Sequence, residues 1–129
     1  VDFRAGGMIE SSYDPAAKFG ERNNIRNQIL AVVPERVFVM QNVQAPAKTP
    51  FDARTFQKTQ TALLLTPLGD QRTRVTVVNS GYGTGASWDG VYEFFRQGNA
   101  WTLTQLRQRF ENGPTDWTKT RTPGSSAGK

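Results

Sequence analysis

The chain has 129 residues, of which 36% are hydrophobic and 21% charged, and its formal net charge is +5. These values are typical of one soluble globular domain. Cysteine and histidine are both absent, which excludes a Ser-His-Asp triad, a cysteine nucleophile, a disulfide framework and any zinc site built on those residues. No apolar run approaches the ~18 residues of a membrane span. The basic residues are scattered, so we expect a solvated basic surface and consider a nucleic-acid partner unlikely.

The first two thirds of the chain predicts an antiparallel sheet. Runs rich in β-branched and aromatic residues are separated by proline and glycine turns, such as Pro34-Glu35 and Pro67–Asp70. The connections are too short for crossover helices, so we expect an antiparallel meander of about five strands. The predicted strands are Met8–Tyr13, Ile25–Val33, Arg36–Val43, Arg54–Thr66 and Gln71–Ser80.

One long amphipathic helix is predicted over Ser87–Asn112. Ser87 suits the N-cap, Asp89 and Glu93 suit the first turns, and Gly113-Pro114 is a stop signal. An apolar face this wide requires a partner surface, which the sheet supplies. Its stripe recurs every three or four residues and comprises Trp88, Tyr92, Phe95, Asn99, Leu103, Leu106 and Phe110.

Two weaker patterns bear on chemistry. Gly81–Ala86 matches the dinucleotide-binding pattern G-x-G-x-x-A between a strand and a helix, but no further strand follows. We therefore interpret these glycines as a turn. A catalytic acid–base pair could come from five carboxylates, but the sequence shows neither convergence nor a shifted pKa. The five carboxylates are Glu10, Asp14, Glu35, Asp89 and Glu93.

Several short motifs, in order, resemble a known superfamily. They are Ala5-Gly6-Gly7, Val33–Val37, Thr73-Arg74-Val75, Gly81-Tyr82-Gly83, and Tyr92–Phe95 with Gly98-Asn99 and Leu103–Leu106. Together they resemble the START-like, helix-grip (SRPBCC) superfamily, in the branch similar to the activator of Hsp90 ATPase homologue. The resemblance implies an α+β fold, in which a curved antiparallel sheet of about five strands packs on one long C-terminal helix around an apolar pocket.

The resemblance also implies an incomplete N-terminus. Family domains begin with a further strand and two short helices, for which this chain has no counterpart. We therefore expect a truncated single domain over residues 1–114 and a polar, disordered tail over Thr115–Lys129. The missing strand would pair beside Gln71–Ser80, so we expect an exposed edge through which a homodimer can form. The compartment is left open between cytoplasm and periplasm.

The expected function is binding of a small apolar or amphipathic molecule between sheet and helix, without assigned catalysis, metal or cofactor. Two alternatives stay open: a protein-interaction module similar to the cochaperone branch, and a cyclase- or dehydratase-like enzyme using pocket carboxylates. A slip of one residue in strand facing would invert the strand members of the site. The predicted lining residues are Ile29, Met40, Leu63, Leu65, Val75, Val77, Asn79, Tyr92, Phe95 and Asn99.

Overall fold

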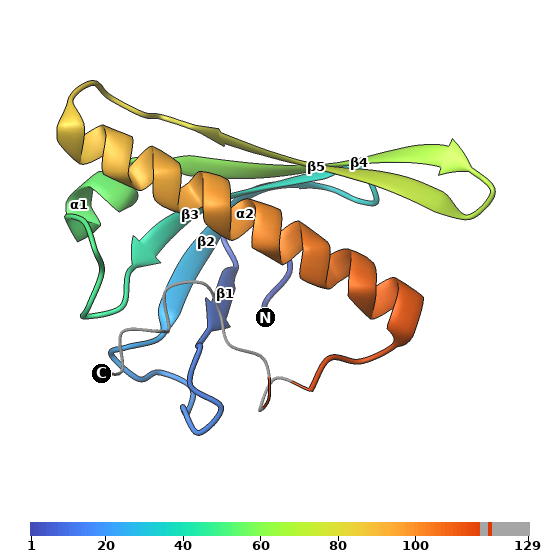
Figure 1. Ribbon diagram of the computed structural model, residues 1–129, viewed down its shortest axis with the longest axis horizontal. Helices are drawn as coiled ribbons and strands as arrows, with labels where there is room; N and C mark the ends of the chain where they lie inside the picture. Colours follow the sequence, from blue (N-terminus) through green and yellow to red (C-terminus); the bar gives the residue numbers. More distant parts are fainter. Residues whose placement is uncertain (117–118, 120–129) are drawn as a thin grey trace.

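The computed structural model describes residues 1–116 and residue 119, so most of the predicted tail, Thr115–Lys129, lies outside the described residues. Five antiparallel strands form one curved sheet in the order β1-β2-β3-β4-β5, and the long C-terminal helix α2 crosses one of its faces (Figure 1). This confirms the predicted fold class. In the described part of the chain, no helix is both long and apolar enough to cross a membrane. The elements are β1 (Met8–Ser11), β2 (Ile25–Val33), β3 (Val37–Gln44), α1 (Ala53–Phe56), β4 (Gln60–Gly69), β5 (Arg72–Ser80) and α2 (Ala86–Asn112).

The fourth strand begins later and ends later than the sequence predicts. Residues 53–56 form the short helix α1, whose N-cap Asp52 accepts a hydrogen bond from the backbone N–H of Arg54 at 2.8 Å. The strand then continues through Pro67, which pairs with Thr73. Only residues Gln60–Leu64 of β4 pair with β3. Pro67 lies beyond them and has a neighbouring strand on one side only, so its missing N–H breaks no ladder hydrogen bond to β3.

The long helix is confirmed, with one correction at its start. It begins at Ala86, and the capping position is Gly85, which has φ 101° and offers no side-chain hydrogen bond. The prediction of Ser87 as N-cap was therefore wrong. The stop is as predicted, since Gly113 has φ 84° and its N–H donates to Arg109 O at 3.1 Å.

The strand register divides the sheet into two faces. Asn99 on α2 hydrogen bonds to Asn79 on β5, so the face that carries Asn79 is the helix-side face. Residues directly opposite in an antiparallel pair share a face. A bulge at Leu30 breaks the alternation in β2, so Ala31 lies on the opposite, outer face from Ile29. The register places Ile29, Met40, Thr61, Leu63, Leu65, Val75, Val77 and Asn79 on the helix-side face.

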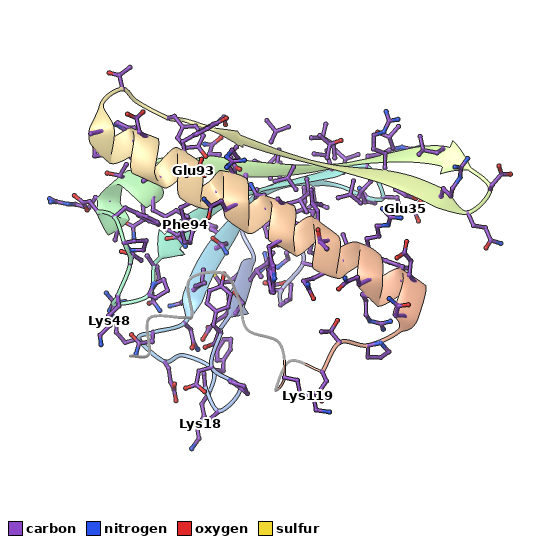
Figure 2. The ribbon with its side chains drawn as sticks, viewed as in Figure 1. Lys18, Glu35, Lys48, Glu93, Phe94 and Lys119 are labelled. Atoms are coloured by element: carbon purple, nitrogen blue, oxygen red, sulfur yellow. The ribbon has the colours of Figure 1, made fainter. Side chains whose placement is uncertain are left out.

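Aromatic side chains fasten the first half of α2. Phe94, labelled in Figure 2, lies 4.9 Å from Phe51 between ring centroids, and Phe95 lies 5.2 Å from Phe56 of α1. Tyr82, just after β5, meets Phe95 at 6.4 Å. The pairs with Phe51 and Tyr82 are edge-on and the pair with Phe56 is tilted. Edge-on ring pairs add roughly 0.5–1.5 kcal/mol each beyond simple burial. The far end of α2 is different, because Phe110 is 85% exposed.

The core of this domain is thin. Among the described residues, the buried apolar side chains are Ile29, Ala45 and Val91. Most apolar side chains of the helix-side face are only half-buried, including Leu63 and Val77 at the middle of the sheet. The helix therefore covers the sheet without sealing it.

Candidate ligand-binding site

An apolar recess of about 130 Å³ opens at the β2–β3 turn end of the sheet. Its floor is made by Val32, Phe38 and Leu65, which come from three neighbouring strands. Val32 is opposite Phe38 in the ladder, and Phe38 is opposite Leu63, so this floor belongs to the helix-side face. The recess is lined by Phe3, Val32, Val33, Glu35, Arg36, Val37, Phe38 and Leu65.

The N-terminal segment forms one wall of this recess. The ring of Phe3 packs edge-on against Phe38, with 5.3 Å between centroids. The chain can fold back because Gly7 approaches the carbonyl of Asp2 so closely that any side chain on Gly7 would collide with it. The backbone N–H of Asp2 also donates to Met8 O at 3.0 Å. The Gly-Gly pair thus lets Phe3 reach the sheet.

The rim of the recess is polar, while its interior is apolar. Glu35 occupies the β2–β3 turn with φ 59°, and both it and Arg36 are exposed. The Arg36 carbonyl accepts a hydrogen bond from Leu65 N at 2.7 Å, which fixes β4 against the turn. An apolar interior with opposite charges at its mouth suits a molecule that is itself apolar at one end.

The structure brings together the sheet members of the predicted site. Seven of the predicted residues share the helix-side face, and Leu65 lines the recess. Ile29 is fully buried, so its side chain offers no exposed surface on this face. A role for these residues in ligand binding stays a prediction. The seven are Ile29, Met40, Leu63, Leu65, Val75, Val77 and Asn79.

The predicted helix residues lie elsewhere. Tyr92 is 56% exposed and contacts the ring of Tyr82 at 5.6 Å. Phe95 belongs to the aromatic cluster with Phe56. Asn99 Nδ2 donates to Asn79 Oδ1 at 2.5 Å, and Asn79 Nδ2 donates to Thr61 Oγ1 at 2.7 Å. This chain of three polar side chains links helix to sheet beside the apolar face.

The sequence interpretation missed seven of the eight lining residues, and three of them show why. Phe38 alternates in phase with Met40, so the strand period alone could have included it. Val32 returns to the helix-side face only because Leu30 bulges, and Phe3 reaches it only because the chain folds back. Neither the bulge nor the folding back of the N-terminal segment can be recognised from the alternation of apolar and polar residues in the sequence.

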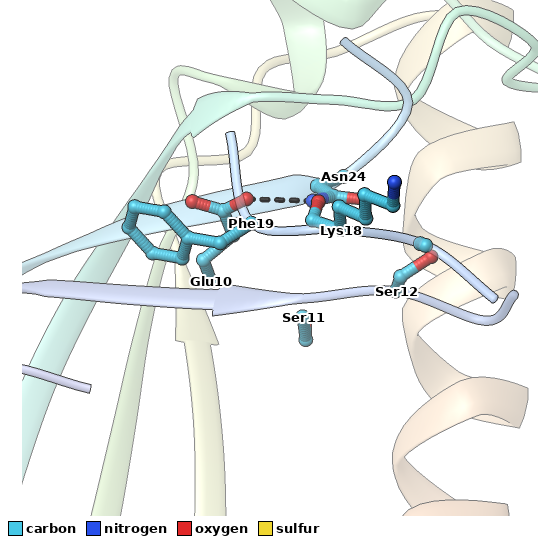
Figure 3. A pocket seen from close by; sticks show the side chains of 7 residues that line it. Glu10, Ser11, Ser12, Lys18, Phe19 and Asn24 are labelled. Atoms are coloured by element: carbon cyan, nitrogen blue, oxygen red, sulfur yellow. Dashed lines mark hydrogen bonds between the residues drawn. The ribbon is translucent and has the colours of Figure 1, made fainter. Parts of the chain in front are cut away.

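A second, polar recess of about 190 Å³ lies at the β1–β2 connection (Figure 3). Glu10 Oε1 accepts hydrogen bonds of 2.6 Å from both Asn24 Nδ2 and Gly20 N. These two hydrogen bonds lower the pKa of Glu10, and the bond from Asn24 has the larger effect. Arg26 Nε lies 3.8 Å from the other carboxylate oxygen, Oε2. The carboxylate pins the connecting loop to β1, and a lowered pKa is the reverse of what a general acid needs.

Comparison with known proteins adds no relative. No family model, curated protein or solved structure matches this chain. The likeness to a helix-grip arrangement therefore rests on the sheet and the long C-terminal helix themselves.

Proposed function

We propose that the protein binds a small apolar or amphipathic molecule on the helix-side face of its sheet. The observation that carries the proposal is the recess lined by Phe3, Val32, Phe38 and Leu65, with charged side chains at its mouth. Its volume of about 130 Å³ is close to the ~150 Å³ cavity that holds a benzene ring in another protein. The recess therefore has room for a single ring or a short acyl segment.

The surroundings of the recess support the same function. The neighbouring side chains of the helix-side face, such as Leu63, Val75 and Val77, are half-buried. A molecule larger than the recess could thus extend along this face. The resemblance to START-like proteins, which bind apolar ligands between sheet and helix, agrees with this proposal.

The test combines a search for a natural ligand with a defined probe. Native mass spectrometry of protein purified from cells should reveal a bound small molecule. Octanoate should cause saturable NMR shifts around Leu65. Leu65→Phe, which fills the recess, should weaken octanoate binding at least ~10-fold, while Leu64→Phe on the outer face should leave it unchanged. No co-purified molecule together with no saturable shift would refute the proposal.

A protein-interaction module, similar to the cochaperone branch, is the second candidate. It is supported by the outer face of the sheet, where Val33, Leu64 and Val78 are 52%, 39% and 46% exposed. An added charge at Leu64 should then abolish association with a partner while leaving octanoate binding intact.

The enzyme alternative gains no support from the carboxylates. Hydrogen bonds from Arg96 and Gln97 lower the pKa of Glu93 to about 2. The pKa of Glu10 is also lowered, by hydrogen bonds from Asn24 and Gly20. A general acid working near neutral pH requires a raised carboxyl pKa.

A further inference from the structure

Two rows of small and branched side chains run across the outer face of the sheet. The register places Ala31, Val39, Ala62 and Val78 directly beside one another on β2 to β5. One step along the strands, it aligns a second row of Val33, Val37, Leu64 and Thr76. Seven of these eight side chains are apolar and none is charged, so the rows form a continuous apolar surface, the outer patch.

Nothing in the described part of the chain covers the outer patch. Helix α2 crosses the opposite face of the sheet (Figure 1), where Asn99 hydrogen bonds to Asn79. The ring of Phe56 on α1 packs against Phe95 of α2. The most prominent members of the patch, Val33, Leu64 and Val78, are therefore open to solvent. A contiguous apolar surface of this kind typically marks an interaction site.

The borders of the outer patch differ from each other. Along one side runs an amide-rich row of Gln28, Gln41, Gln60 and Ser80. On the opposite side the register places Thr66 beside Arg74, near the turn residue Glu35. One border thus offers neutral hydrogen-bond donors and acceptors. The other carries charged side chains, to which such amides can form hydrogen bonds.

We propose that the outer patch binds a second copy of this chain, face to face. The two-fold axis of this dimer lies between the two apolar rows and is perpendicular to the strands. The first row of each copy then packs on the second row of its partner. Ala62 then faces Leu64 and Ala31 faces Val33, so small side chains meet larger ones. The same axis lays the amide row over the border with Arg74 and Glu35, so no like charges oppose each other. The strands run antiparallel across the interface, within the ~30° range of aligned sheet packing.

The size of the contact indicates a reversible dimer. Four strands at ~4.8 Å spacing and four rows at ~6.7 Å spacing cover roughly 500 Å² per copy, or about 1,000 Å² in total. Specific interfaces begin near this area, and the smallest of them are transient. The curvature of the sheet confines the contact to these central rows. This inference names the partner for the interaction-module candidate. Val33 and Val37 belong to the outer patch and also line the recess, so ligand binding is measured on the same variants.

The test is sedimentation equilibrium of the full chain from ~1 μM to ~1 mM, with two matched variants. Leu64→Lys places a charge at the centre of the outer patch. Leu68→Lys makes the same change on the same strand, at a residue of similar exposure (43%), in the β4–β5 hairpin beyond the patch. We expect wild type and Leu68→Lys to dimerise with similar constants and Leu64→Lys to dimerise at least ~10-fold more weakly. Circular dichroism checks that each variant is folded.

Two results would overturn the inference. One is a wild-type chain that stays monomeric at ~1 mM. The other is a folded Leu64→Lys that dimerises like wild type, which would indicate pairing through the open edge of β5 instead. If Leu64→Lys fails to fold, Val78→Lys in the same patch takes its place. Octanoate binding measured on the same variants shows separately whether the recess works.

Discussion

The hydrogen-bonded chain from Asn99 through Asn79 to Thr61 should act as one energetic unit that joins α2 to the sheet. Its two bonds are 2.5 and 2.7 Å long and part-buried. Each such bond contributes ~1 kcal/mol, and a partner left unpaired in a buried position costs about 1–3 kcal/mol. Asn99→Ala removes one bond and leaves Asn79 Oδ1 unpaired, so we expect a loss of about 1–2 kcal/mol. Asn79→Ala removes both bonds, and we expect about 2–3 kcal/mol.

The decisive quantity is the coupling between the two substitutions. Once Asn79 is gone, Asn99 has lost its partner on the sheet, so the double variant should be less destabilised than the sum of the singles by ~1 kcal/mol. Urea unfolding followed by circular dichroism measures all three free energies. Thr102→Ala, at an exposed position of the same helix, corrects for the gain of up to ~0.7 kcal/mol in helix propensity. Single effects that add to within ~0.3 kcal/mol would refute the reasoning.

Two further predictions concern α2. The bonds from Arg96 and Gln97 hold the pKa of Glu93 at about 2, below its ordinary 4.5, so its stabilising contribution is present above pH ~4.5 and is lost as the pH falls toward 2. Glu93→Gln should flatten the dependence of the melting temperature on pH between ~5 and 2, and an unchanged slope would contradict this. Gly98→Ala should raise the free energy of unfolding by ~0.5–1 kcal/mol, because helix propensity improves and the new methyl group meets no atom within 4 Å. A lower urea midpoint would show that the space beside Gly98 is occupied.

The fold was largely predictable because its long elements carry strong periodic signals. The stripe on α2 and its glycine stop define a helix that the structure reproduces within one residue at its start. In β3 the regular alternation of the sequence is kept, because Phe38 and Met40 lie on one face and Val37 and Val39 on the other. Local signals were less reliable where elements are short, since α1 has only four residues and too little length to show a period.

The site was harder to predict because it depends on how strands align. The extra residue Leu30 exchanges the faces of Ala31 and Val32 relative to a regular strand, which creates both the floor of the recess and one end of the outer patch. Tyr92 illustrates a second limit. It belongs to the apolar stripe of the helix, yet it lies beside Tyr82 at the flank of the contact, because a wide stripe does not say which of its members meets the sheet.

The uneven attachment of α2 has a mechanical consequence. The helix is held by its aromatic first half and by Asn99, while Phe110 near its end stands in solvent. From Asn99 to Phe110 an α-helix extends ~16 Å at ~1.5 Å per residue. A tilt of about 10° around Asn99 would therefore displace that end by roughly 3 Å, a distance comparable to the thickness of an aromatic ring. Such a pivot would change the room between helix and sheet without breaking a backbone hydrogen bond.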